Sequence, residues 1–293
     1  MTIKLLFILS FLYLLILVAY VRGFIPNYAS TYTDKESVLG DSSKIIDTKN
    51  KLELTFFDVG QGDSIYIKTP NDERLLIDGG ASYDVDYKIS KKFVYPFCYF
   101  DNIFLTHPHL DHYGGLKKVT QRCDFGNFTF NDIQCKSNSC KYFSGISTNN
   151  SILIGDKFSF KDVTIKVLWP DIKNNNVDYS NVNNLSVVMF LDYGDFEAIL
   201  TGDAELEALN QIDLSEVTPL IQNGLDVFKI SHHGAKNGLS FRLLEQLKPH
   251  NCVISVGKDN KYGHPNKEVL EYLSLIKCNV LRTDEIGDIT FLW

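Results

Sequence analysis

The feature that most constrains this chain is a run of four potential metal ligands within six residues: His107, His109, Asp111 and His112. They follow an apolar run at 103–105, so we expect a strand to deliver them to one point and the glycine pair behind them to let a helix begin. Imidazole suits Zn, Mn or Fe, and a carboxylate completes the ligand set of a hydrolytic metal. His107 and His109 can face one ion, while Asp111 and His112 face a second. Because the chain has only seven histidines, we favour a metal site over solvated loop histidines.

Two later strand ends carry further candidate ligands. Asp203 follows the apolar run 196–200 and a glycine that lets a ligand approach closely, so we favour a metal ligand over a helix N-cap. His232 and His233 follow the apolar run 227–230. Neighbouring residues at a strand end point apart, so only one of the two histidines should face a metal. We choose His232 as the ligand and expect His233 to support the site or to contact substrate.

Three residues are assigned roles beside the metal. Asp78 follows the apolar run 75–77, and we expect it to hold the ligand loop and the histidine tautomers, with an ordinary turn residue as the alternative. His264 lies in the turn Tyr262-Gly263-His264-Pro265, where it would contact a phosphate or give a proton to the leaving oxygen. A structural turn histidine is the alternative there. Asp111 is expected to be both a ligand and a catalytic residue.

Taken in order, the motifs resemble the metallo-β-lactamase superfamily. The HxHxDH run carries that resemblance, and the motifs around it are similar to the hydrolase domain attached to ComEC-type competence proteins. The resemblance extends from about residue 51 to the C-terminus. The further motifs are Phe56-Phe57-Asp58-Val59-Gly60-Gln61-Gly62-Asp63-Ser64, then Leu75–Gly80, Ile199–Asp203, Lys229–Gly234 and Tyr262–Pro265.

This resemblance implies a fold and a cofactor. The fold would be an α/β, four-layer αββα sandwich, here preceded by one N-terminal apolar helix. The cofactor would be two divalent metal ions, Zn or Mn, with Asp203 as the carboxylate that bridges them. A metal-bound hydroxide would then be the nucleophile.

One departure from the family pattern concerns the first metal. Typical members supply a third histidine between the HxHxDH run and the bridging carboxylate, but this chain has no histidine between His112 and His232. Asn183 and Asn184 occupy roughly that place, as the ComEC-like branch also tends to have, and Asn184 is our candidate ligand or supporting residue. An amide oxygen binds these metals more weakly than imidazole, so the first ion should be held loosely, favour Mn²⁺ or bind only with substrate. Turn capping is the alternative for both asparagines.

The pattern of apolar and polar residues predicts three segments along the chain. They are a membrane anchor or signal segment at 1–23, a polar linker at 24–50 and the hydrolase domain at 51–293. Leu5–Val21 carries no charge, and its seventeen residues span roughly 25 Å as a helix, the short end of a membrane span. No clean cleavage site follows, so we favour an uncleaved anchor over a signal peptide. Lys4 and Arg22 nearly balance, which leaves the orientation in the membrane open.

The six cysteines bear on the compartment. Cys135 and Cys140 lie close enough in a polar stretch to close a small disulfide loop, which favours export over a reducing compartment. Cys252 and Cys278 lie in apolar, strand-like runs and are expected to be buried. We therefore expect a membrane-anchored protein with an exported hydrolase domain, the alternatives being a secreted protein or a domain that faces the cytoplasm.

Hydrophobic patterning predicts strands and helices in an order that suits two mixed sheets packed face to face with helices outside. Residues 121–150 have a weak period and are interpreted as an inserted surface segment. The expected strands are 52–57, 64–67, 74–77, 162–169, 186–191, 196–200, 227–230, 253–256, 279–281 and 288–293, and the expected helices are 205–212, 239–247 and 267–276.

Charge bears on the substrate. The net charge of −7 argues mildly against a nucleic-acid surface, but residues 226–267 hold seven basic and three acidic residues, a local charge of +4. With the resemblance, this favours a ComEC-like nuclease or phosphodiesterase acting on single-stranded DNA or another phosphodiester. A small-molecule ester, lactone or phosphorylcholine hydrolase is the alternative, and a degenerate binding module is the third hypothesis. The N-terminal segment predicts a contact with a membrane, and the sequence leaves protein partners unknown.

Overall fold

The computed structural model describes residues 50–293, except 94–95, 132–137, 150 and 175. The predicted segment 1–23 and nearly all of the predicted linker 24–50 lie outside the described residues, as does Cys135 of the predicted Cys135–Cys140 disulfide. Within the described part, none of the helices combines the length and the apolar character that crossing a membrane requires. The architecture given below concerns this part of the chain.

The first sheet carries the HxHxDH run. Its strand order is β13-β1-β2-β3-β4-β5, in which β3, β4 and β5 are parallel and the other neighbours antiparallel. The last strand of the chain thus closes this sheet beside the first. The strands are β1 Glu53–Phe56, β2 Ile65–Lys68, β3 Arg74–Ile77, β4 Tyr99–Leu105, β5 Asp124–Phe130 and β13 Ile289–Leu292.

The second sheet has the order β12-β11-β10-β9-β8-β7-β6, with β9 to β12 parallel and β6 to β9 antiparallel. Tyr193 pairs with Phe196, so β8 and β9, both predicted as strands, form a hairpin. The strands are β6 Lys157–Phe160, β7 Val163–Trp169, β8 Val188–Tyr193, β9 Phe196–Leu200, β10 Val227–Lys229, β11 Asn251–Ile254 and β12 Asn279–Arg282.

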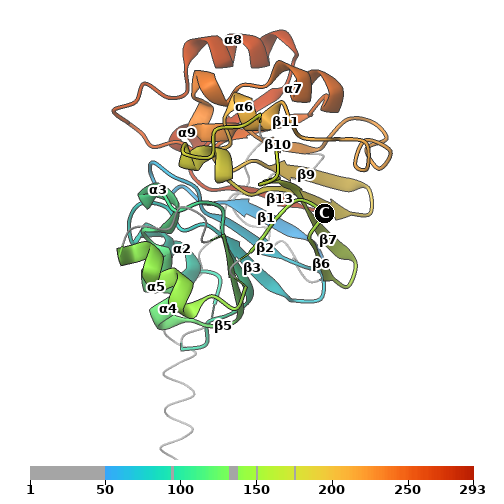
Figure 1. Ribbon diagram of the computed structural model, residues 1–293. Helices are drawn as coiled ribbons and strands as arrows, with labels where there is room; N and C mark the ends of the chain where they lie inside the picture. Colours follow the sequence, from blue (N-terminus) through green and yellow to red (C-terminus); the bar gives the residue numbers. More distant parts are fainter. Residues whose placement is uncertain (1–49, 94–95, 132–137, 150, 175) are drawn as a thin grey trace, which may run out of the picture. The chain divides into compact units, whose positions relative to one another are not determined.

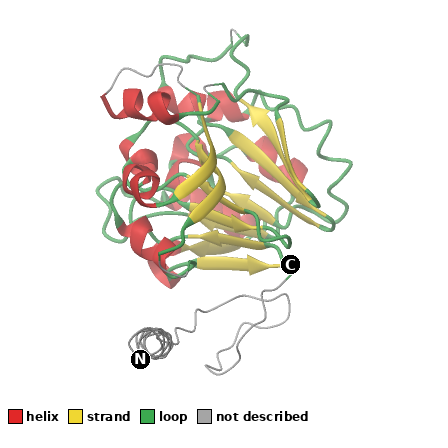
Figure 2. Cartoon of the chain, turned by 90° about the horizontal axis from the view of Figure 1, so that it is seen from below, coloured by secondary structure: helices red, strands yellow, loops and turns green. Residues whose placement is uncertain are grey.

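Three apolar clusters define the layers, which Figures 1 and 2 show as two sheets with helices on their outer faces. One cluster lies between the sheets, where Phe104 and Val187 are fully buried. A second joins α2, α4 and α5 to the first sheet, and a third joins α6, α7 and α8 to the second sheet. The helices are α2 Asp84–Ser90, α3 Leu110–Tyr113, α4 Leu116–Arg122, α5 Asn138–Ile146, α6 Leu206–Leu209, α7 Phe241–Leu247, α8 Lys267–Leu275 and α9 Thr283–Ile286.

The predicted two-sheet α/β fold is confirmed, but the interpretation of 121–150 as an inserted surface segment is wrong. This segment supplies β5, which pairs with β4, and α5, which packs outside it. Phe128 and Phe130 are fully buried in these contacts. The exposed first half of β5 and its glycine hide the alternation of buried and exposed residues that would have marked a strand.

In the described part of the chain, two disulfides each connect two neighbouring parallel strands. Cys98 is bonded to Cys123 across β4, α3 and α4. Cys252, within β11, is bonded to Cys278 across the rest of that strand and α8. Both cysteines of the second pair are buried, as expected, and they are joined to each other. Each bridge holds the amino ends of two parallel strands together, and the HxHxDH run follows the carboxyl end of one of them, β4.

Candidate metal centre

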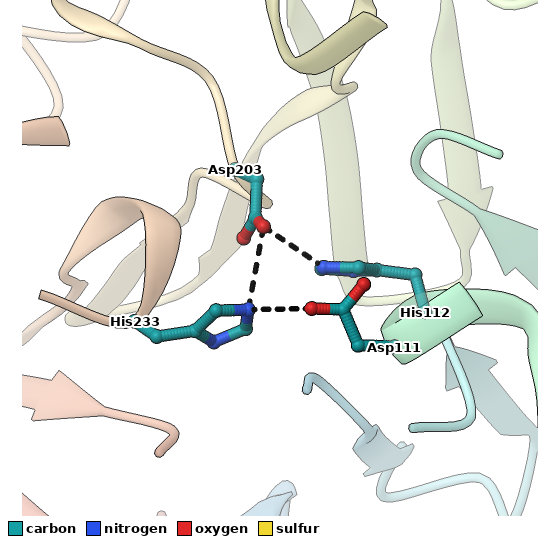
Figure 3. A group of neighbouring side chains, drawn as sticks. All are labelled: Asp111, His112, Asp203 and His233. Carbon is teal, nitrogen blue, oxygen red and sulfur yellow. Dashed lines mark ion pairs between the residues drawn. The ribbon is translucent and has the colours of Figure 1, made fainter. Parts of the chain in front are cut away.

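Four predicted or candidate ligands meet where strands of both sheets end, as Figure 3 shows. Asp111, His112, Asp203 and His233 each offer one ligand atom, and these atoms all lie within 4.8 Å of one another. The Nε2 atom of His233 is 3.4 Å from Asp111 Oδ2 and 3.3 Å from Asp203 Oδ2. The Nε2 atom of His112 is 3.1 Å from the same Asp203 oxygen. We call these four residues the metal cluster.

The ring nitrogens and a carboxylate oxygen here fit a divalent cation. The Nε2 atoms of His107, His112 and His233 and the Oδ1 atom of Asp203 are buried and have no hydrogen-bond partner in the described structure. A buried polar atom left without a partner is unfavourable unless a ligand satisfies it. Imidazole nitrogens and carboxylate oxygens are the donors that Zn and Mn use in proteins. The residues present therefore fit the implied metal.

Asp78 orients two of the histidines, as predicted for a residue that supports the ligands. Its carboxylate accepts hydrogen bonds from the backbone N–H and the hydroxyl of Thr106, at 2.8 and 2.7 Å, and from His112 Nδ1 at 2.7 Å. The Thr106 hydroxyl in turn lies 3.2 Å from His107 Nδ1. A donated Nδ1–H fixes the tautomer and leaves Nε2 to face a metal. Asp78 is fully buried and has a positive φ of 60°.

The structure places His233 in the metal cluster, whereas we had chosen His232 from the sequence. Both histidines have left-handed backbone angles, with φ of 51° and 55°, and the regular alternation of a strand does not hold there. His233 is 1% exposed and its Nδ1 donates to the carbonyl of Ser255 at 2.9 Å, which aims Nε2 at the cluster. His232 points elsewhere, with Nδ1 3.7 Å from Glu205 Oε1. Strained backbone of this kind gathers at functional sites.

His107 and His109 lie next to the metal cluster. The ring of His107 is 4.1 Å from that of His112 and 4.7 Å from that of His109, centroid to centroid. His107 is buried and His109 is half-buried. Burial, followed by the charge of His112, lowers the pKa of both rings, which keeps them neutral and able to donate a lone pair.

The hydrogen bonds of the Asn184 side chain use its amide nitrogen, and its Oδ1 is buried without a hydrogen-bond partner in the described structure. Its Nδ2 donates to the carbonyl of Asp178 at 3.0 Å and to Glu207 Oε2 at 2.9 Å, and neither residue belongs to the metal cluster. Asn183 donates to Glu205 Oε1 at 2.8 Å, the oxygen that lies near His232. The asparagines are thus bound to the helical segment behind Asp203, and their metal-binding role stays a prediction.

Histidines and carboxylates shift one another's pKa values in the metal cluster. Burial opposes a charged ring at His233, but Asp203 and Asp111 outweigh it and raise the pKa of His233 to about 10. The pKa of His112 is raised well above its usual value by Asp203 and Asp78, again against burial. Burial likewise opposes ionisation of Asp203 and Asp111, yet the two histidines lower the pKa of both carboxyl groups. Protons here neutralise carboxylates that a bound cation would also neutralise.

Lys229 was not recognised as a site residue from the sequence. It is fully buried, and its Nζ lies 2.5 Å from Asp63 Oδ2 and 2.8 Å from the carbonyl of Gly202, to which it donates. Asp63, Asp78 and His112 are also close enough to share an ion. Because Lys229 already neutralises Asp63, we interpret that group as an ion-paired support for the ligands. Its position in the apolar run of β10 was the sequence feature that could have identified Lys229 as a buried, functional lysine.

Asp111 is held from behind by the first loop of the domain. Its carbonyl accepts a hydrogen bond from the backbone N–H of Asp63 at 3.2 Å. Gly62 has a φ of 128°, and a Cβ there would lie 2.1 Å from the carbonyl oxygen of Asp111. The glycine-rich turn at 60–62 is therefore required for close approach of the loop to α3.

His264 lies at the edge of the site. Its ring centroid is 5.8 Å from that of His232, and its Nδ1 is buried without a hydrogen-bond partner in the described structure. Burial, and after it the charges of His232 and His233, lowers the pKa of His264. A neutral imidazole still donates one hydrogen bond, which suits the predicted phosphate contact better than the predicted proton donor.

Three of the seven basic residues of the predicted basic stretch at 226–267 form ion pairs in the folded chain. Lys229 is paired with Asp63, Lys236 with Glu268, and Lys267 with Glu271. Lys258 and Lys261 are exposed on the loop between β11 and α8. Part of the local excess of charge in the sequence is therefore balanced by acidic residues elsewhere in the chain.

The comparisons with known proteins agree with this geometry. Residues 57–141 match the family model of the metallo-beta-lactamase superfamily. ComE operon protein 3 of Bacillus subtilis is 31% identical over 262 residues, which cover 82% of this chain and 33% of that protein. Recombination protein 2 of Haemophilus influenzae is 26% identical over 247 residues, covering 83% of this chain and 29% of that protein.

The chain spans about a third of the length of the curated relatives that it matches. Among solved structures, a metal-dependent hydrolase of the β-lactamase superfamily has a TM-score of 0.52 and 12% identity, covering 81% of this chain and 98% of that one. This likeness concerns the fold alone. The resemblance inferred from the motifs is confirmed: the chain is a metallo-β-lactamase superfamily protein that is similar to ComEC-type competence proteins.

Proposed function

We propose that this chain is a metal-dependent phosphodiesterase that cleaves single-stranded DNA or a related phosphodiester. The observation that carries the proposal is the metal cluster of Asp111, His112, Asp203 and His233, whose ligand atoms lie within 4.8 Å of one another. The names of two curated relatives, Recombination protein 2 and Competence protein ComA, favour a nucleic-acid substrate.

Two ions, Zn or Mn, would be held by neighbouring groups of residues. One would bind in the metal cluster, and the other beside it at His107 and His109, with Asp203 shared between them. When bound, such ions activate water and neutralise charge that develops on a phosphoryl group. The second group has fewer strong donors than the metal cluster, so we propose that it holds its ion less tightly.

The chain's own residues supply position and a substrate contact. Asp78 and the carbonyl of Ser255 fix the tautomers of His112 and His233, so that Nε2 of each ring faces the site. Lys229 holds the carbonyl of Gly202 and thereby the loop that presents Asp203. His264, at the edge, donates a hydrogen bond to a phosphate oxygen of the substrate.

The test compares substrates under controlled metal content. Wild-type protein and Asp111→Ala, both freed of metal and then loaded with Mn²⁺ or Zn²⁺, are assayed on single-stranded DNA, bis(4-nitrophenyl) phosphate and a β-lactam, with elemental analysis of each sample. We expect hydrolysis of the two phosphodiesters by the wild type alone. Hydrolysis of the lactam, or of a lactone or carboxylic ester, in place of the phosphodiesters would refute the proposal and favour a small-molecule hydrolase.

We further propose that the hydrolase domain is exported and anchored to the membrane by residues 1–23. The disulfides Cys98–Cys123 and Cys252–Cys278 support an oxidising compartment, where such bonds persist. Protease added to intact cells should then degrade the domain. A domain protected until the cells are lysed, with reduced cysteines, would contradict export.

A further inference from the structure

A series of five aromatic rings extends from the metal cluster. Adjacent ring centroids are 5.6 Å apart from His112 to His233, 6.2 Å from His233 to His232, 5.8 Å from His232 to His264 and 5.7 Å from His264 to Tyr262. The last two rings are stacked, at an interplanar angle of 27°. The series begins at fully buried ligands and ends at a side chain that is 68% exposed. We call it the ring series.

Tyr262, the outer member, is presented by a braced loop between β11 and α8. Asn260 Oδ1 accepts hydrogen bonds from the backbone N–H groups of Tyr262 and His264, both at 3.1 Å. Asn260 Nδ2 donates to the carbonyls of Gly257 and His264, at 3.0 and 2.6 Å. Four hydrogen bonds to one side chain fix the loop, so the exposed ring is held in place before any ligand arrives. Such preorganisation reduces the entropy lost on binding.

The charges around the ring series suit a phosphate-bearing ligand. Lys258 and Lys261 are exposed on the same loop as Tyr262, and Asp259 is the acidic residue between them. Glu205 lies near His232, but it accepts a hydrogen bond from Asn183 and is about four-fifths buried. The loop therefore adds a local positive charge beside an exposed aromatic face, the combination that binds single-stranded nucleic acid.

We propose that Tyr262 stacks on an unpaired nucleobase of the substrate, next to the phosphodiester that is cleaved at the metal cluster. This inference rests on the proposed phosphodiesterase function and assigns its substrate class, a nucleotide-containing single strand. A base within a duplex is already stacked and paired, and it reaches an outside ring only at the expense of those contacts. Tyr262 thus favours single strands without reading their sequence, because every base has a face to stack.

The first experiment separates the base from the phosphodiester. Wild type and Tyr262→Ala, loaded with the same metal, are compared on thymidine 5′-(4-nitrophenyl) phosphate and methyl 4-nitrophenyl phosphate, which share a leaving group. In the wild type, kcat/KM should favour the thymidine ester. Tyr262→Ala should lower the ratio of the two kcat/KM values on the order of tenfold, and Tyr262→Phe, which keeps the ring, should retain the ratio.

Phe97→Ala is the matched control. Phe97 is 77% exposed and lies just before β4, at the end of that strand opposite to the HxHxDH run. Its removal should leave the ratio of kcat/KM values at the wild-type level. A fall in the ratio for Phe97→Ala as large as that for Tyr262→Ala would overturn the assignment.

The second experiment measures binding without activity. In EDTA, fluorescence anisotropy gives the affinities for a labelled oligothymidylate and for an abasic strand with the same number of phosphates. Tyr262→Ala should reduce the preference for the thymidylate on the order of tenfold.

The outcomes separate the two proposals. If the wild type hydrolyses both esters and Tyr262→Ala leaves the ratio and the binding preference unchanged, stacking is refuted while the phosphodiesterase function stands. An equal loss on both esters also refutes stacking, since it indicates damage to the metal centre. Hydrolysis of neither ester by metal-loaded wild type refutes the phosphodiesterase function, and the stacking role with it.

Discussion

The two sheets contribute to the metal centre in different ways. The first sheet supplies its ligands from one continuous segment, in which β4 ends at Leu105 and α3 begins at Leu110. The second sheet supplies Asp203 after β9 and His233 after β10, separated in the chain and held on left-handed or glycine-dependent backbone. The residues from the first sheet are neighbours in the sequence, whereas those from the second sheet meet only because β9 and β10 pack side by side.

The two sheets also differ in the contacts that hold their candidate ligands in place. In the first sheet, a single buried carboxylate, Asp78, orients two histidines through hydrogen bonds. In the second sheet, Lys229 holds the Gly202 carbonyl from within the core, and Ser255 holds His233. A ligand that lies on strained backbone is kept there by the surrounding contacts, so the second sheet should be the more sensitive to changes in its core.

The largest effect should come from removing one carboxylate from each region. Asp111→Ala and Asp203→Ala should each lower metal-dependent hydrolysis about 1000-fold or more, because charge stabilisation worth several kcal/mol is lost. Far-ultraviolet circular dichroism should show the fold retained. Asp195→Ala, at the exposed turn between β8 and β9, is the control and should keep full activity. Full activity in either cluster variant, with metal still bound, would contradict the assignment.

The next effect concerns the buried cation of the second region. Lys229→Met removes the nearest cation from the buried Asp63, which should lower the free energy of unfolding by roughly 3–5 kcal/mol in urea titrations. Adding Asp63→Asn should recover much of that loss. Lys236→Met breaks a pair whose side chains are 67% and 60% exposed and should change stability by about 1 kcal/mol or less. Equal effects for the two lysines would show that Lys229 is not a structural cation.

The two disulfides allow a like-for-like comparison of the regions. The sequence separations are 25 residues for Cys98–Cys123 and 26 residues for Cys252–Cys278, so the loop-closure entropy predicts nearly equal losses. Replacing either pair by serine should lower the free energy of unfolding by roughly 2–4 kcal/mol, measured with and without reductant. A much larger loss for one pair would mean that the two crossovers are not equivalent.

The two metal positions should differ in affinity. The metal cluster offers four donors, whereas His107 and His109 have no third histidine, so the ion at His107 and His109 should dissociate at least about tenfold more readily than the ion in the metal cluster. Stepwise dialysis with elemental analysis should show one ion retained and one lost, with activity restored by added Mn²⁺ or Zn²⁺. Asn184→His should raise retention only if that side chain turns from Glu207 toward the ligands. Two equally tight ions in the wild type would refute the prediction.

The smallest expected effect compares one buried glutamate from each sheet. Glu53 in β1 is paired with Lys92, whereas Glu197 in β9 faces Asp192 in register. Burial, and then the charge of Asp226, raises the pKa of Glu197 to about 7.

The direction in which stability changes with pH follows from proton binding at Glu197. The folded state holds a proton on Glu197 that the unfolded state releases, so stability present below the ordinary pKa is lost as pH rises toward 7 and above. With a discount for solvent screening, Glu197→Gln should be more stable than wild type by about 1 kcal/mol at pH 8 and equal to it at pH 4. Thermal unfolding at both pH values checks this, and a pH-independent difference would contradict it.

Much of the fold was predictable because its periodic segments are long and apolar. The β8–β9 hairpin and the helices α7 and α8 follow directly from alternation or helical spacing. The strand β5 was not predictable in this way, since only its second half is buried and its pairing with β4 is what defines it.

The sequence by itself determined the superfamily of this protein and where half of the candidate metal centre lies. The candidate ligands His107 to His112 are close in the chain, so their spacing alone brings them to one turn at the end of β4. Only the tertiary structure decided that His233 enters the metal cluster in place of His232 and that Lys229 neutralises Asp63 inside the core. The reason is physical: left-handed backbone and a buried charge are both unfavourable locally, and they persist only where contacts from distant parts of the chain compensate for them.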